Sequence, residues 1–277
     1  MGLPSFDDDL TDGVRGKPRI QVLEIRDPKQ PDGEPIAWVM VERQVTYKRD
    51  KPNDPVYEAS IRLSFEQILP KYERREHDKG EFCGHYSMHM SHYSQDSVSL
   101  TSSTSGSGAV FLDPPSLRGL RIGTYLMNEI VTWAQRWPDA IVNSVSLSSG
   151  QARDDNKDRR NWFYEQFGLV FDYSDTEHTE GRSRPMPVKE LIQVDEWKKN
   201  ITERRMVDYL ADVLYAERDA SSELKHRTKV LHERIADIRK AEASPIRWAL
   251  KVLYYKHAGG GAVVAVLGAA LWWHFRG

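Results

Sequence analysis

Hydrophobic and polar residues alternate over several short stretches in the first hundred residues of the chain. Segments 19–26 and 36–47 are rich in β-branched and aromatic residues and are separated by the turn-like sequence DPKQPDGEP, so we expect two strands there. Segments 82–92 and 97–103 alternate in the same way and predict two further strands. This part of the chain therefore predicts a sheet.

Helical spacing first occurs at residues 61–75, where we expect a helix that Pro70 interrupts. From residue 108 onward, strand and helix patterns alternate. The elements expected there are a strand at 108–113, a helix at 121–137, a strand at 140–147, a helix at about 156–167 and a strand at 168–173. This order predicts the α/β class, with a mixed central sheet flanked by helices.

Beyond about residue 198, apolar residues recur at alternating intervals of three and four, and most other positions are charged. The apolar frame consists of Val207, Leu210, Leu214, Leu224, Thr228, Leu231, Ile235 and Ile238. Glu217 and Ser221 interrupt it. We expect a long helical stalk with a coiled-coil seam that ends near Ser244 and Pro245, and a homo-oligomer formed through that seam.

The C-terminal segment 258–275 contains no Asp, Glu, Lys or Arg and is just long enough to span a hydrocarbon core about 30 Å thick. Residues 224–256 before it are rich in Lys and Arg. By the positive-inside rule, this pattern predicts a C-terminal hydrophobic helix that anchors the protein by a single pass, with the preceding domains in the cytoplasm. The alternative is a buried hydrophobic hairpin or a packing helix in an assembly.

Composition narrows the class of protein and its compartment. The 277 residues include 39 Lys and Arg and 41 Asp and Glu, a formal net charge of -2, so no charge excess points to nucleic-acid binding. The single cysteine, Cys83, excludes an intramolecular disulfide and favours a reducing compartment. The N-terminus has no pattern of a secretory signal peptide.

The chain is therefore expected to divide into four parts. These are a flexible N-terminal arm at 1–17, an α/β domain at 18–195, a coiled-coil helix at 196–244, and a basic juxtamembrane segment with a transmembrane anchor at 245–277.

The strongest motif lies between Pro115 and Thr124, where a strand leads through a glycine-containing turn into a helix. Such a turn leaves backbone N–H groups unpaired at the positive end of the helix dipole, an arrangement that binds phosphate oxygens. Gly119 and Gly123 would permit close backbone approach, and Arg118 and Arg121 would add charged donors. The alternative is an ordinary turn with packing glycines and a solvated Arg118.

Two segments together resemble the GNAT superfamily of N-acetyltransferases. Residues 110–124, VFLDPPSLRGLRIGT, resemble its acetyl-coenzyme A motif R/Q-x-x-G-x-G/A. Residues 161–170, NWFYEQFGLV, resemble its second signature, F-Y-x-x-x-G-F. The resemblance implies direct transfer of an acetyl group from acetyl-CoA to a primary amine, which is either a small molecule or a protein.

The resemblance also implies roles for individual residues. Tyr164 would lie near the coenzyme sulfur and act as general acid. The residues that it assigns to the cofactor are Val110, Phe111, Leu112, Arg118, Gly119, Leu120, Arg121, Ile122, Gly123, Thr124 and Asn156. The general base stays open between Asp113, Asp172 and a water molecule. An alternative for Tyr164 is an aromatic residue that only packs against its neighbours.

This sequence departs from the family pattern at two positions. Arg121 replaces the first glycine of the first motif, which is compatible with cofactor binding if that position keeps helical backbone angles. Leu169 replaces the final phenylalanine of the second signature.

Cys83, His85, His89 and His92, with His77 nearby, are residue types that bind zinc, but their spacing argues against a metal site. Neighbouring residues on one face of a strand lie about 6–7 Å apart, so a single ion would not reach all of them. We expect either a polar sheet face or a histidine that lines the groove for the amine.

A second class of function is open on sequence grounds. The coiled coil, the hydrophobic end and Arg121 are also compatible with a non-catalytic structural or scaffold protein of a membrane-associated or virion assembly. In that protein the acyltransferase domain would be degenerate.

Overall fold

The computed structural model describes residues 19–68, 79–89, 95–102, 117–152, 156–246 and 255. The chain divides into two compact units, Met1–Tyr209 and Leu210–Gly277. The first unit is a mixed α/β domain, and the second contains most of a long helix.

The α/β domain is built on an eight-stranded sheet with the order β10-β6-β5-β4-β3-β2-β1-β11. Its strands are β1 (Ile20–Ile25), β2 (Ala37–Lys48), β3 (Glu58–Gln67), β4 (Lys79–Ser87), β5 (Ser97–Ser99), β6 (Ile141–Val142), β10 (Met186–Pro187) and β11 (Ile201–Arg205). Within this sheet, β5 and β6 are parallel and the other neighbours are antiparallel. The predicted mixed α/β class is confirmed.

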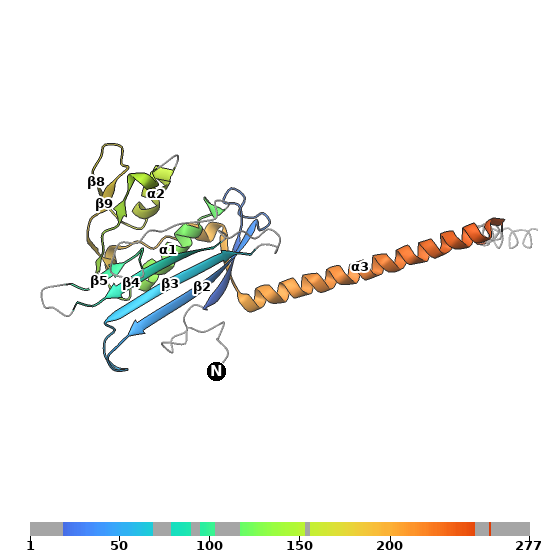
Figure 1. Cartoon of the computed structure of the whole chain (residues 1–277), viewed down its shortest axis with the longest axis horizontal. Coiled ribbons are helices and arrows are strands. Elements are labelled where there is room, and N and C mark those ends of the chain that lie inside the picture. The colour runs from blue at the N-terminus through green and yellow to red at the C-terminus, as the bar shows by residue number, and fades with distance from the viewer. Residues whose placement is uncertain are drawn as a thin grey trace, which may run out of the picture. The chain divides into compact units, whose positions relative to one another are not determined.

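A second sheet has three strands in the order β7-β9-β8. These strands are β7 (Ser146–Leu147), β8 (Phe171–Tyr173) and β9 (Gly181–Ser183). The helices are α1 (Ile122–Ala134), α2 (Asn156–Glu165) and α3 (Met206–Ala243), with short 3-10 turns η2 (Ser149–Gln151), η3 (Val188–Glu190) and η4 (Glu196–Lys199). Figure 1 shows α2 near β8 and β9, and α1 against the main sheet.

Helix α1 forms the centre of the core because it packs directly on β3 and β4. A Cβ atom at Gly84 on β4 would lie 2.9 Å from Ile130 and 3.1 Å from Trp133 of α1. Glycine at this position therefore lets the helix approach the sheet closely. Trp133 is 1% exposed and its ring contacts Trp137 edge to face, with centroids 5.1 Å apart.

The helix predicted at 61–75 is wrong, because residues 58–67 form strand β3. Ile61, Leu63 and Phe65 are buried, whereas Arg62 between them is exposed, which is the period-two pattern of a strand. The central position of β3 between β2 and β4 supplies backbone partners on both sides. Residues 69–75 lie outside the described residues.

The single strand predicted at 140–147 is also wrong. Its first part is β6 in the main sheet and its last part is β7 in the small sheet. The strand predicted at 168–173 is shorter than expected and begins at Phe171, because Gly168 has a φ of +89° and turns the chain after α2. The strand predicted at 108–113 lies outside the described residues.

The long helix is confirmed, but it begins at Met206 and not near residue 196. Residues 201–205 form β11 and pair with β1, so they belong to the main sheet. The predicted seam residues on α3 are exposed, between 45% for Leu210 and 64% for Leu224. Among the residues that the model describes, no helix combines the length and apolar character needed to cross a bilayer, and the predicted anchor at 258–275 lies outside them.

Candidate functional site

The candidate site lies where the two parallel strands of the main sheet separate. The N–H of Asn143 donates to the carbonyl of Val98 at 2.7 Å, which is the last link between this segment and β5. Two residues later, the N–H of Val145 donates to the hydroxyl of Ser183 in the small sheet. The sheet therefore opens at the carboxyl ends of β5 and β6, the position where α/β sheets bind ligands.

The N-terminus of α1 lies in the crossover between these strands. Among the described residues, no side chain caps this helix end. The N–H groups of its first turn, at Ile122, Gly123 and Thr124, are therefore available beside the positive end of the helix dipole. Gly119 precedes them with a φ of +79°, and a Cβ atom there would meet no atom within 4 Å. Backbone N–H groups at a helix start of this kind can bind an anion.

Arg121, the N-cap residue, does not have helical backbone angles. Its φ of 64° and ψ of 13° are left-handed, so the condition of helical angles, under which an arginine here would be compatible with cofactor binding, is not met. Its side chain is partly buried, and a guanidinium N–H donates to Oδ1 of Asn200 at 3.0 Å. This contact directs the Arg121 side chain toward Asn200, whereas Arg118 is exposed on the turn.

Asn200 holds this turn in place from a distant part of the sequence. Its side-chain amide donates to the carbonyls of Leu120 and Arg26 at 3.2 and 3.1 Å, and its backbone carbonyl accepts from the N–H of Arg26. Only 2% of Asn200 is exposed. Sequence reasoning missed this residue, since no local pattern marks an asparagine that bonds across 79 residues.

The two segments that resemble the acetyltransferase motifs lie next to each other in the fold. A Cβ atom at Gly123 would lie 3.4 Å from Cε2 of Phe163 on α2. The rings of Phe163 and Tyr164 are in turn in edge contact, with centroids 5.0 Å apart. The structure therefore brings the start of α1 and the second motif together.

Tyr164 is 8% exposed and contacts Phe163 and Phe171. Burial raises the pKa of its phenol to about 12, and the charge of Arg160 opposes this rise. Its hydroxyl makes no hydrogen bond to a described residue. A thiol has a reference pKa of about 8.5, so complete proton transfer from Tyr164 to a thiolate is opposed by a pKa difference of about 3.5. This phenol is suited to donate a hydrogen bond.

The other predicted cofactor residues divide into three groups. Ile122 and Thr124 are buried and Leu120 is partly buried, so only their backbone groups are candidates for contact with a cofactor. Asn156 begins α2, and its amide donates to the carbonyl of Gln151 and accepts from Arg159. Its side-chain contacts are therefore local. Val110, Phe111 and Leu112 lie outside the described residues.

The residues considered as general base or as groove histidine differ in their surroundings. Asp172 is exposed and accepts two hydrogen bonds from Arg184, which lower the pKa of its carboxyl and make it a weak base. Asp113 lies outside the described residues. Burial lowers the pKa of His85, whose side chain is 8% exposed on β4.

The cysteine and histidines of β4 do not gather around one point. Burial raises the pKa of Cys83 to about 12, and its thiol donates to Glu81 at 3.0 Å. Asp96 accepts from the N–H of His89, at the end of the strand. In the described ranges, no group of three or more metal-binding side chains is close enough to hold an ion. His77 and His92 lie outside those ranges.

Arg160 is a buried cation that no sequence pattern marks. It donates to the carbonyls of Ser148 and Thr179 and to Oδ1 of Asn161, and so fixes α2 against the loops of the small sheet.

Comparison of the chain with protein-family models, curated proteins and solved structures finds no match.

Proposed function

We propose that the α/β domain is an N-acetyltransferase of the GNAT type, which transfers an acetyl group from acetyl-CoA directly to a primary amine. The contact between Gly123 and Phe163 carries this proposal, because it joins the two motif segments at the point where β5 and β6 separate. The uncapped start of α1 provides the anion-binding part of the site.

The residues that would hold the cofactor are those of the turn. Backbone N–H groups of Gly119 and of Arg121 to Gly123 would bind the pyrophosphate, and the exposed Arg118 would add a charged donor. Arg121 supports the turn through Asn200. Bound acetyl-CoA would supply an activated thioester.

The chain's own contribution to the chemistry is orientation and hydrogen bonding. The amine would form a bond to the acetyl carbon as the carbon–sulfur bond breaks, and the proton that the amine loses would pass to water. Tyr164 keeps its proton over the physiological pH range and donates a hydrogen bond to the departing sulfur. Holding both reactants in line supplies the remaining acceleration.

Cofactor binding is the first test. Full-length protein in mild detergent is titrated with acetyl-CoA by calorimetry, and thiol release is then followed with a panel of amines. No binding at millimolar acetyl-CoA would overturn the proposal. A truncated domain must retain β11 and therefore end at or after Tyr209.

Tyr164→Phe tests the assigned role. We expect a fall in turnover of about tenfold or more, with little change in acetyl-CoA affinity, because the hydroxyl acts on the departing group. Tyr173→Phe is the matched control, since the Tyr173 hydroxyl is bonded to Glu165. Equal turnover in the Tyr164→Phe variant and the wild type would remove Tyr164 from the mechanism.

We further propose that segment 258–275 tethers this activity to a membrane, with the α/β domain on the cytoplasmic side. Deletion of 245–277 should move the protein from the membrane to the soluble fraction. A full-length chain found in the soluble fraction would contradict the anchor.

Two observations favour the second class, a scaffold protein with a degenerate domain. Arg121 occupies a left-handed position where the family has glycine, and the side-chain amide of Asn156 is taken up by Gln151 and Arg159. The calorimetric titration separates the two classes, because a degenerate domain would bind acetyl-CoA weakly or not at all.

A further inference from the structure

Helix α3 carries an exposed stripe, which we call the seam. It follows intervals of four and three residues and consists of Leu210, Leu214, Glu217, Ser221, Leu224, Thr228, Leu231, Ile235 and Ile238. Its leucines and isoleucines are between 45% and 64% exposed. Leu or Ile at this spacing forms knobs that a second helix accommodates in its holes.

The positions on either side of the seam, e and g of the heptad, are basic. They hold Arg218, Lys225, Arg227, His232, Arg234 and Arg239, together with Ala211, Val213, Ala220 and Ala241. Away from the seam, the b, c and f positions carry the acidic residues Asp208, Asp212, Asp219, Glu223, Glu233 and Asp237. The b and f positions also hold Lys229 and Lys240, so these positions have mixed charge, whereas the charged residues at the edges of the seam are all basic.

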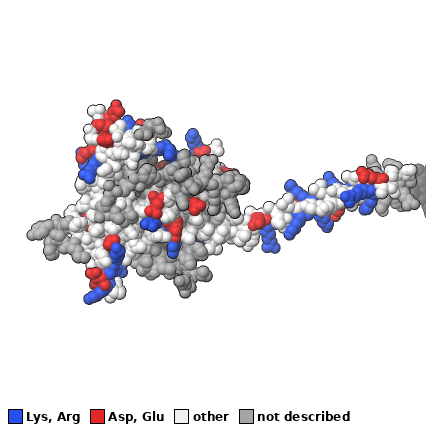
Figure 2. Space-filling model, in the orientation of Figure 1, with Lys and Arg blue, Asp and Glu red and all other residues white. Residues whose placement is uncertain are grey.

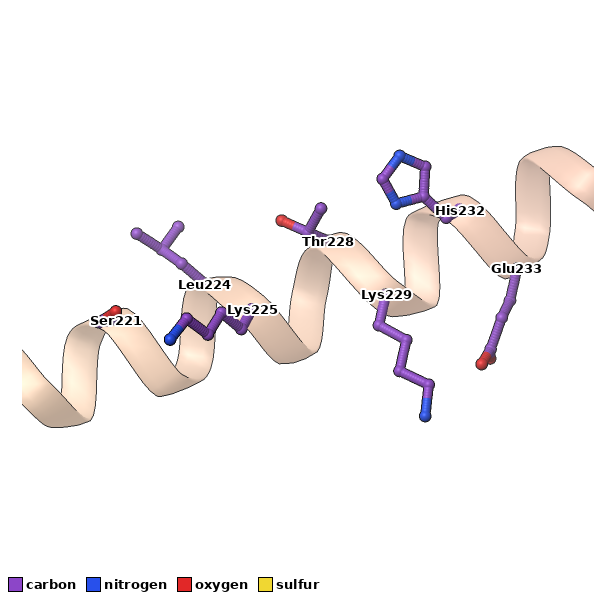
Figure 3. Close-up of a pocket in the computed structure, with 7 residues that line it drawn as sticks. All are labelled: Ser221, Leu224, Lys225, Thr228, Lys229, His232 and Glu233. Atoms are coloured by element: carbon purple, nitrogen blue, oxygen red, sulfur yellow. The ribbon is translucent and has the colours of Figure 1, made fainter.

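The side chains in the middle of α3 show which residues lie on the side of the seam. In Figure 3, Leu224, Thr228 and His232 project from the same side of the helix, whereas Lys229 and Glu233 project from the opposite side. These residues line a shallow, open hollow along the helix surface. Figure 2 shows basic side chains along the visible length of α3. Arg227 has an ion pair with Glu223, but both side chains are more than half exposed, so the pair neutralises little.

A second copy of this chain is a poor partner for the seam. In a parallel pair, g positions face e positions of the next heptad, so Arg234 would face Arg239 of the other copy. In an antiparallel pair, e faces e and g faces g, which again opposes like charges. Glu217 would also meet its own equivalent inside a parallel pair. The charges on α3 therefore oppose the predicted homo-oligomer.

A membrane surface is also a poor partner. Interfacial helices need a broad apolar face, whereas this stripe has the narrow two-position width of a coiled coil. Glu217 and Ser221 interrupt it near its middle.

We propose that the seam of α3 docks an amphipathic helix of another protein whose own flanking positions are acidic. Heptad packing supplies the contact, and the complementary charges at e and g select the partner and suppress self-association. This inference does not depend on the proposed acyltransferase activity.

Designed peptides test the proposal without knowledge of the natural partner. Three fluorescent helical peptides of about five heptads are titrated with the full-length chain in mild detergent. The first has Ile and Leu in the seam and Glu at every e and g position. The second has Lys at those positions, and the third keeps Glu but has Ser in the seam. We expect the first to bind at least about tenfold more tightly than either of the others.

Charge reversal on α3 supplies the matched variants. Arg227→Glu/Arg234→Glu changes two g positions, and Lys229→Glu/Lys240→Glu changes a b and an f position with the same change in net charge. The first variant should weaken binding of the acidic peptide by about tenfold or more and improve binding of the basic one. The second should change both by less than about threefold.

Three results would overturn the proposal. One is equal affinity for the acidic and basic peptides, including the case in which neither peptide binds and the chain binds only anionic vesicles that contain phosphatidylserine. Another is equal affinity for the acidic peptides with apolar and with serine seams. The third is sedimentation of the chain as a homo-oligomer that Leu224→Asn/Leu231→Asn converts to monomer.

Discussion

Helices α1 and α3 are both amphipathic in sequence, but they obtain their stability from different sources. Residues of α1 that include Leu126, Ile130 and Trp133 are fully or almost fully buried. The 38 residues of α3 remain largely exposed, and its composition of Ala, Leu, Glu, Lys and Arg has high intrinsic helix propensity. A helical pattern therefore predicts a helix, whereas the surrounding residues decide whether its apolar face is buried in the core or stays exposed.

The same substitution in the two helices provides the sharpest contrast. Leu126 is 0% exposed and Leu224 is 64% exposed. Leu126→Ala should lower the free energy of unfolding by about 2–5 kcal/mol through lost burial and a residual cavity. Leu224→Ala should change it by about 0.5 kcal/mol or less. Chemical denaturation followed by tryptophan fluorescence measures both.

Equal losses in the two variants would show that the seam of α3 is covered in the isolated protein. That outcome would also count against the acidic partner proposed above, because a covered seam in the isolated protein implies self-association.

Close packing of α1 on the sheet gives the next largest effect. A Cβ atom at Gly84 would lie 2.9 Å from Cγ2 of Ile130 and 3.0 Å from Ile61, so Gly84→Ala should destabilise the domain by about 1–3 kcal/mol. Combining it with Ile130→Ala should recover part of that loss, and a double-mutant cycle of unfolding free energies measures the coupling. Strictly additive losses would contradict the contact between β4 and α1.

The α/β domain should also lose stability at high pH, and the burial of Tyr164 should contribute to that loss. Its phenol has a pKa of about 12 in the folded protein against an ordinary value of 10.0. Between these values the unfolded chain loses the proton first, so the contribution of Tyr164 to stability is complete below about pH 10 and falls by about 1.4 kcal/mol for each pH unit between there and about pH 12. Urea unfolding at pH 9 and pH 11 should show a smaller loss for Tyr164→Phe than for the wild type. Identical losses would contradict the buried phenol.

Local periodicity accounts for the elements that the sequence predicts well. β1, β2, α1 and α3 each have a run of apolar residues at the spacing of the element that they form, whereas α2 has few apolar residues and is predicted from its position in the alternation of strands and helices. The helix predicted over β3 is wrong because Ile61, Phe65 and Ile68 also have the i, i+4, i+7 spacing of a helix when the two neighbouring strands are unknown. The division of 140–147 depends on partners distant in the sequence, Val98 on one side and Ser183 on the other.

The candidate site is predictable only where its residues are local. The turn that precedes α1 has a pattern of glycine and arginine that by itself indicates anion binding. The contact of Gly123 with Phe163 and the support of the turn by Asn200 both join residues about 40 or more positions apart. The left-handed backbone of Arg121 belongs to the turn that Asn200 supports, so no local pattern indicates it.

The smallest expected effect concerns glycine against alanine at two positions, residue 121 at the start of α1 and residue 236 in the middle of α3. At position 121 the backbone is left-handed, a conformation that is unfavourable by about 1–2 kcal/mol for a residue with a Cβ atom. Arg121→Gly and Arg121→Ala both lose the hydrogen bond to Asn200, so their difference isolates the backbone. We expect the glycine variant to have a free energy of unfolding about 1 kcal/mol higher than that of the alanine variant.

In the middle of α3 the order should be reversed. Ala236 is exposed and helical, so Ala236→Gly should reduce the helix signal in circular dichroism, since glycine is about 1 kcal/mol less favourable than alanine in a helix interior. Opposite signs at the two positions would establish that Arg121 occupies a glycine-type conformation. The same sign at both would mean that residue 121 adopts ordinary helical angles, and the arginine would then fit the acetyl-coenzyme A motif without strain.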